Sequence, residues 1–155
     1  MAIRYTSEQW EQFKDIHRRW WAGELERPLI PIVVNDRDPE RPCPPTEPLS
    51  QANCNDFSIT PEQIIDRADW ELSKYTFLSD SCPILSMMQF GPGVLAAFIG
   101  CKLDNSSGRV WFHPEKDWKI QDLHFEFNAA APWFNRIKDI CAAGVRRWKG
   151  NVLIA

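Results

Sequence analysis

Residues 151–155, Asn-Val-Leu-Ile-Ala, follow a helical pattern and a Lys-Gly pair, and they form an apolar stretch typical of a β-strand. A strand that is apolar on both faces belongs inside a parallel sheet with helices on both sides. The sequence places no turn, cap or polar tail after this strand that would cover it. We therefore expect the chain to be the front part of a larger α/β protein.

Composition limits the class of protein. The 155 residues are 44% apolar and 25% charged, as in an ordinary globular domain. A net charge of −3 favours neither nucleic acid nor an anionic membrane as a partner. No segment has the length of a signal peptide or of a membrane span. The five widely spaced cysteines predict reduced thiols and a cytoplasmic location.

Three helices are predicted from capping and periodicity. Thr6 and Gln9 form a capping box before a helix at 7–22, which ends at Gly23. Thr60, Pro61 and Gln63 begin a second helix that extends to residue 76. A third helix begins at Pro132, and a short apolar helix is expected at 94–100.

Three buried strands are predicted between the helices, at 29–34, 83–90 and 152–155. Strands that alternate with helices predict βαβ units and a parallel sheet. A short extended piece is expected at 109–112 and a loop at 118–127. Residues 36–57 carry five prolines and predict a long loop, either functional or a disordered excursion.

Ligands of parallel α/β proteins collect at the carboxyl ends of the strands, so the candidate site residues were sought there. Asp36 is a candidate general acid or base, with a simple turn residue as the alternative. His113, at a strand exit, is a second catalytic candidate, although most isolated histidines are not catalytic. Candidates for substrate contact are Asn35, Arg37, Gln89, Phe90 and Trp111.

Gly91 and Gly93 flank a proline just before the short helix, and backbone N–H groups at such a position can cradle an anion. They are the candidates for cofactor binding. The alternative is a tight turn from strand to helix, because the motif matches neither dinucleotide-binding nor P-loop spacing. No cluster of metal ligands is visible in the sequence.

Three stretches together resemble the uroporphyrinogen decarboxylase-like superfamily, in particular a bacterial branch. They are 20–28 (Trp-Trp-Ala-Gly-Glu-Leu-Glu-Arg-Pro), 90–100 (Phe-Gly-Pro-Gly-Val-Leu-Ala-Ala-Phe-Ile-Gly) and 110–114 (Val-Trp-Phe-His-Pro). The superfamily also contains cobalamin-dependent methyltransferases. The resemblance covers most of the chain from about residue 10, and 90–100 is its most specific part.

The resemblance implies the N-terminal part of a (β/α)₈ TIM-type barrel, with about three parallel strands, an N-terminal helix and covering helices. Residues 1–155 would be one partial-barrel domain, with a helical extension at 1–26 and the first β/α units at 27–155. Decarboxylases of the superfamily carry an arginine-rich motif after the first strand, and in this chain only Arg37 stands at a corresponding place. They also carry an acidic residue at the end of the second strand, and this chain has none there. Porphyrinogen decarboxylation is therefore disfavoured.

We expect the chain to be inactive alone and to need no cofactor or metal by itself. A homo-oligomer or a complementary chain would cover the open barrel. Two alternatives are a self-associating module without catalysis and a complete small α/β protein whose last strand lies at the sheet centre.

Overall fold

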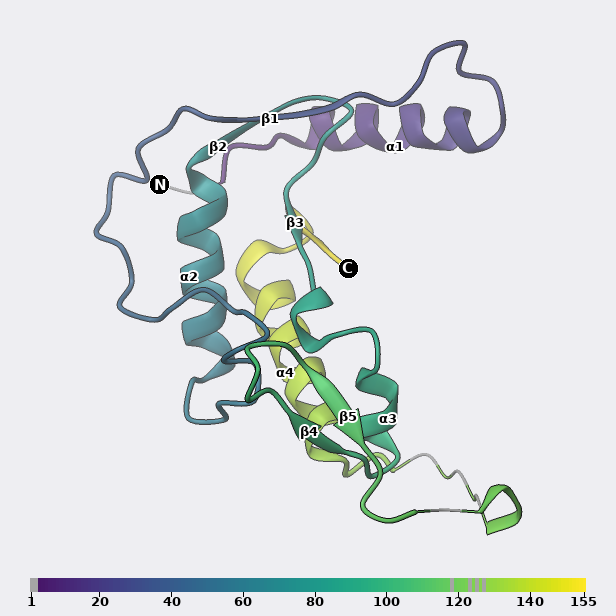
Figure 1. Ribbon diagram of the computed structural model, residues 1–155. Coiled ribbons are helices and arrows are strands. Elements are labelled where there is room, and N and C mark those ends of the chain that lie inside the picture. Colours follow the sequence, from purple (N-terminus) through teal and green to yellow (C-terminus); the bar gives the residue numbers. More distant parts are fainter. Residues whose placement is uncertain (1–2, 118, 123, 125, 127) are drawn as a thin grey trace.

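The computed structural model describes residues 3–117, 119–122, 124, 126 and 128–155 (Figure 1). It mixes helices with short strands around two packed helices, α2 (Pro61–Ser73) and α4 (Pro132–Trp148). The buried side chains that these helices contribute to the core include Ile64, Ile65, Ile140, Ala143 and Trp148. The α/β class expected from the sequence is therefore confirmed at this coarse level.

The first helix, α1 (Ser7–Trp21), begins where its capping box predicts. The Thr6 hydroxyl accepts from the Gln9 N–H at 3.2 Å, and the Gln9 side chain accepts from the Thr6 N–H at 2.8 Å. Gly23, with a φ of 74°, follows the helix and takes the left-handed backbone that favours glycine. The apolar stripe of α1 packs on the rest of the molecule through Trp10 and Phe13, which are partly buried.

The second helix also has its predicted capping box, between Thr60 and Gln63. However, α2 ends at Ser73, three residues before the predicted end at 76. The following residues form β2 (Tyr75–Ser79), which pairs antiparallel with β1 (Pro31–Asn35). The alternation in β2 buries Phe77 and leaves its neighbours partly or largely exposed, a pattern of a half-buried strand.

The first predicted strand is therefore wrong in two respects. It pairs with β2 in an antiparallel ladder rather than in a parallel sheet, and all five residues of β1 are exposed. The pair β1–β2, whose strands are connected through α2, lies across one end of the molecule beside α1 (Figure 1). An apolar run of β-branched residues does not by itself distinguish a buried strand from an exposed one.

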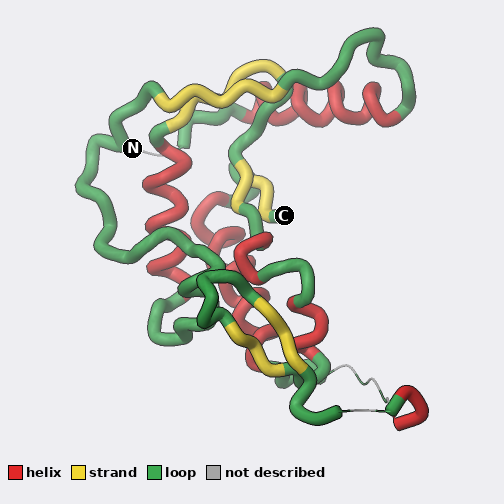
Figure 2. The backbone as a smooth tube through the Cα atoms, in the orientation of Figure 1, coloured by secondary structure: helices red, strands yellow, loops and turns green. Residues whose placement is uncertain are grey.

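One pair of strands is parallel, β3 (Ile84–Leu85) with β6 (Leu153–Ile154). The predicted strand at 83–90 is thus much shorter, because Met88–Phe90 form a 3₁₀ helix, η1. Figure 2 shows the strands as three separate two-stranded ladders. The expected three parallel strands are corrected to one parallel pair, in which β6 lies at an edge and not at a sheet centre.

An antiparallel hairpin of β4 (Lys102–Asp104) and β5 (Trp111–His113) follows the short helix α3 (Val94–Phe98). The extended piece predicted at 109–112 corresponds to β5, whereas β4 was not predicted. The loop expected at 118–127 contains a 3₁₀ helix, η2 (Ile120–Asp122). Residues 118, 123, 125 and 127 of that prediction lie outside the described residues.

The proline-rich segment 36–57 has neither helix nor strand, as predicted, but it is not an excursion away from the molecule. The Trp70 indole donates to the Arg41 carbonyl at 3.1 Å, and Arg67 donates to the carbonyls of Pro44 and Thr46. Cys54 is fully buried. Side chains of α2 therefore hold the backbone of this loop against the helix.

The five cysteines, all within the described residues, are free thiols. Among the helices described, none has both the length and the apolar character needed to cross a membrane.

Candidate functional site

The parallel pair β3–β6 is the part of the fold to which the strand-end argument applies. The N–H groups of Leu153 and Ala155 donate to the carbonyls of Pro83 and Leu85 at 2.9 and 3.0 Å. Beyond the strands, the Met87 N–H donates to the Ala155 carbonyl at 2.6 Å. These bonds align the two carboxyl ends and place the segment after β3 beside the end of β6.

Only one face of this strand pair is covered by a helix. Gly144 of α4 lies so close that a Cβ there would be 2.8 Å from the Ile154 Cδ1 atom and 2.9 Å from the Trp148 ring. On the opposite face, Ile84 and Leu153 stand in register and are 45% and 40% exposed. The chain was expected to supply no cover for its last strand. In the structure α4 covers one face of the strand pair, and the face with Ile84 and Leu153 has no helix over it among the described residues.

The carboxyl end of the pair offers few groups that can perform chemistry. Met88 is 81% exposed, and the Ser86 hydroxyl accepts from its N–H at 3.2 Å. The buried Gln89 Oε1 atom has no hydrogen-bond partner among the described residues. Residues 84–93 contain no acid, histidine or lysine. This end can hold a ligand by hydrogen bonds and apolar contact, but it supplies no general acid or base.

Phe90, a predicted substrate contact, is 1% exposed and lies in the core. Its ring meets that of Trp133 edge-on, with 6.4 Å between the ring centres. Its ring is therefore not presented to a ligand.

Gly91 and Gly93, the predicted cofactor-binding residues, pack against β5 and the residue before it. A Cβ on Gly91, whose φ is 75°, would be 3.3 Å from the Val110 side chain, and one on Gly93 would be 3.1 Å from the Phe112 ring. The close approach of the backbone to these side chains accounts for both glycines, as the tight-turn alternative proposes. The helix that follows, α3, has only five residues.

Trp111 and His113 lie on β5 with both side chains exposed. In the hairpin register His113 faces Lys102, and Trp111 faces Asp104. Hydrogen bonds from Ser106 lower the pKa of Asp104, and the nearby His113 lowers it further. No acid or nucleophile bonded to His113 is found among the described residues.

Asn35 is the last residue of β1 and pairs with Tyr75, and the two residues that follow, Asp36 and Arg37, form a hydrogen-bonded group with β2. The Thr76 hydroxyl donates to Asp36 Oδ1 at 2.7 Å, and Arg37 Nε donates to the Thr76 hydroxyl at 2.9 Å. The N–H groups of Asp36 and Arg37 share the Lys74 carbonyl. These contacts lie at the end of the β1–β2 ladder and favour the structural interpretation of Asp36.

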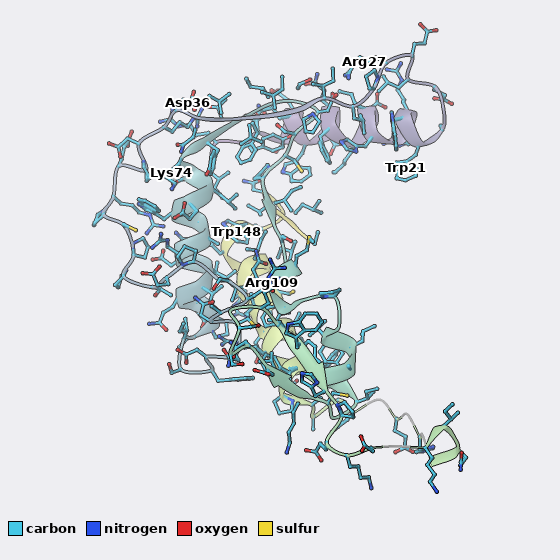
Figure 3. The ribbon with its side chains drawn as sticks, viewed as in Figure 1. Trp21, Arg27, Asp36, Lys74, Arg109 and Trp148 are labelled. Carbon is cyan, nitrogen blue, oxygen red and sulfur yellow. The ribbon has the colours of Figure 1, made fainter. Side chains whose placement is uncertain are left out.

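The two catalytic candidates are not brought together. Figure 3 shows Asp36 beside Lys74, at the end of α2 and well apart from Arg109, which lies in the connection between β4 and β5. Asp36 is bonded to Thr76 and to the Lys74 carbonyl, whereas His113 is paired with Lys102. The described contacts therefore do not bring Asp36 and His113 to one reacting atom.

A groove with a volume of about 560 Å³ lies between α1 and β6 and was not predicted from the residue pattern. Trp10, Glu11 and Lys14 of α1 line one side, and the last turn of α4 and the strand β6 line the other. It adjoins the open edge of the parallel pair, and its lining combines apolar side chains with two lysines.

Sequence reasoning also missed an ion pair between Arg27, in the segment after α1, and the buried Asp80, which follows β2. Asp80, whose side chain is fully buried, accepts from both terminal nitrogens of Arg27 at 2.6 and 2.8 Å and from the Ile30 N–H at 2.7 Å. The His17 ring lies 3.3 Å from the Asp80 carbonyl. Hydrogen bonds from Arg27 are the main cause that lowers the pKa of Asp80 to about 2.

This ion pair predicts a specific dependence of stability on pH. Because the pKa of Asp80 is lowered on folding, the pair stabilises fully above about pH 4 and loses its effect as the pH falls through about 2. The contribution is about 2 kcal/mol. In urea denaturation, the difference between the wild type and Asp80→Asn should be constant from pH 7 to 5 and shrink below pH 4. A difference that stays constant down to pH 2 would contradict the assignment.

Among the described residues, no group of three His, Cys, Asp or Glu side chains is placed to hold a metal ion. Comparison of the chain with protein-family models, with curated proteins and with solved structures finds no match.

Proposed function

We propose that this chain forms the N-terminal wall of a (β/α)₈ barrel of the uroporphyrinogen decarboxylase-like type, located in the cytoplasm. The observation that carries the proposal is the arrangement of β3, α4 and β6: the two strands are parallel, and α4, the last helix of the connection between them, packs on one of their faces. The connection also contains α3 and the β4–β5 hairpin. Two parallel strands with a helix over one face are the repeating unit of a barrel wall. The stretch of sequence resemblance at 90–100 begins at the last residue of η1, the short helix that follows β3.

The open face of the strand pair supports the same proposal. A barrel interior is filled by layers of branched apolar side chains that alternate with residues facing the outer helices. Ile84 and Leu153 would be interior residues, whereas Leu85 and Ile154, one position later, face the helix side. In this proposal Ile84 and Leu153 are exposed because the strands that would face them across the barrel are not part of this chain.

In this proposal the chain is inactive by itself. The carboxyl end of β3 contributes Gln89 and Met88 as ligand contacts, and the groups that transfer protons or methyl groups come from other strands. The reaction class is that of the decarboxylases or corrinoid-dependent methyltransferases, with the former disfavoured by the missing acid after β3.

A second candidate function is a self-associating module without catalysis. The specific observation in its favour is β1, whose five residues are all exposed and whose outer edge is free of strand partners among the described residues. A long exposed apolar edge strand is a template for pairing with another chain.

One experiment separates the two candidates. We expect the chain to self-associate in sedimentation velocity, and Ile84→Glu to weaken the association at least about tenfold, because a carboxylate cannot enter an apolar contact without cost. Val33→Glu, a matched change at a residue that is 50% exposed on β1, should leave the association unchanged.

The opposite pattern, with association lost in Val33→Glu and kept in Ile84→Glu, would replace the barrel proposal by the module. A wild type that stays monomeric from micromolar to millimolar concentration would contradict both. Urea denaturation of each variant checks that neither change unfolds the monomer.

A further inference from the structure

We propose that the groove between α1 and β6 receives an extended peptide segment, which adds to β6 as a further strand and carries an acidic side chain. The inference deepens the proposed function and rests on it, because it names the partner for the edge of the same strand pair. It depends on the open edge and the groove, which Leu153 also lines, whereas the test of the proposed function changes Ile84, which is not among the residues that line the groove.

The backbone of β6 defines what can bind. Leu153 and Ala155 use their N–H groups toward β3, so the N–H and carbonyl of Ile154, between them, point to the opposite side. Within the described part of the chain, neither group of Ile154 has a hydrogen-bond partner. A donor and an acceptor at strand spacing are both satisfied by an extended backbone, which is the basis of strand addition in peptide recognition.

The groove supplies the walls for such a segment. Its volume of about 560 Å³ lies within the usual range of binding pockets, about 300–1,000 Å³. Trp10 forms one wall, and Val145, which is 61% exposed, forms part of the other. Side chains that alternate along the segment would find apolar contact on the side that faces the groove.

The charges at the groove favour an acidic partner. Its lining contains two ammonium groups, Lys14 and Lys149, and one carboxylate, Glu11, which is bonded to Lys14 at 2.8 Å. Lys149 is therefore the uncompensated charge of the lining. It stands in the left-handed backbone region, with a φ of 49°, at the end of α4 and directly before the turn into β6. An acidic side chain at one end of the bound segment would pair with it.

The test uses the full chain carrying Ile84→Glu, so that self-association does not compete, and a synthetic peptide, acetyl-Glu-Val-Thr-Val-Thr-Glu-amide, added up to millimolar concentration. Binding is followed by NMR of the backbone amides. We expect saturable shifts centred on Val152 and Ile154, and binding at least about tenfold weaker for the same peptide with alternate backbone nitrogens methylated, since methylation removes the donors.

Charge is tested by two changes at one position. Lys149→Asn, which tolerates the left-handed backbone, should weaken the binding of the glutamate peptide about threefold, and Lys149→Glu about tenfold. Lys149→Glu should instead favour a peptide with lysine in place of glutamate. Urea denaturation confirms that the variants fold.

Three results would overturn the inference: no shift at millimolar peptide, equal binding of the methylated peptide, or no response to the charge reversal. Equal shifts with hexanoate alone would also overturn it, by showing a site for small amphipathic anions in place of a strand. Any of these outcomes leaves the sedimentation result for Ile84→Glu unaffected, so the failure of the inference is distinguishable from that of the proposed function.

Discussion

Phe90→Ala is expected to lower the free energy of unfolding by about 3–5 kcal/mol, the cost of removing a large buried ring and leaving a cavity. The Phe90 side chain is 1% exposed and lies between the parallel strand pair and the start of α4, in edge contact with Trp133. Denaturation in urea, followed by far-ultraviolet circular dichroism, measures the change.

The matched control for this prediction is Met88→Ala, two residues earlier in the same 3₁₀ helix. Met88 is 81% exposed, and its truncation should change the free energy of unfolding by less than about 0.5 kcal/mol. If Phe90→Ala lowers the free energy of unfolding by less than 1 kcal/mol, the ring is not part of the core. Phe90 would then again be a candidate for substrate contact, as predicted from the sequence.

Asp69→Ala is expected to cost about 3 kcal/mol, because one buried carboxylate joins three parts of the molecule. Its side chain is 5% exposed and accepts from the Trp148 indole at 2.8 Å and from Arg147 at 2.9 Å, both on α4. Arg41 of the proline-rich loop donates to the same oxygen as Arg147, at 3.3 Å. Removal leaves the buried indole N–H without an acceptor.

Two further variants show which part of this contact matters. Asp69→Asn keeps an acceptor for the Trp148 indole and should recover about half of the loss. Asp66→Ala, one turn earlier and 45% exposed, removes a carboxylate that faces the same two arginines and should cost less than about 1 kcal/mol. Equal losses for Asp66→Ala and Asp69→Ala would contradict a buried hub and indicate a general effect of charge.

The helices could be predicted from the sequence because their signals are local. The capping boxes at Thr6 and Thr60 involve residues three apart, and both are present as expected. The strands depend on partners far along the chain, which one sequence does not reveal. β2 was taken for the end of α2 because its partner, β1, is 40 or more residues away, and the pairing overrides the local pattern.

The candidate site also depends on which strands pair, and this pairing could not be predicted from the sequence. The prediction that ligands gather at strand ends assumed that 29–34 and 83–90 belong to one parallel sheet. Because β1 pairs with β2 in an antiparallel ladder separate from β3 and β6, Asp36 and Gln89 lie in different parts of the molecule. Contacts between segments that are distant in the sequence form the groove beside β6 and bury Asp69 and Asp80. No local spacing of residues in the sequence could therefore predict these features.

The central claim is that β6 is paired on one edge and open on the other, and amide hydrogen exchange tests it most directly. In dilute monomeric protein, the Leu153 and Ala155 N–H groups, bonded to β3, should exchange at least about tenfold more slowly than the Ile154 N–H, which faces the open edge. Protection of Ile154 equal to that of its two neighbours would contradict the open edge, and with it the strand-addition groove and the barrel wall.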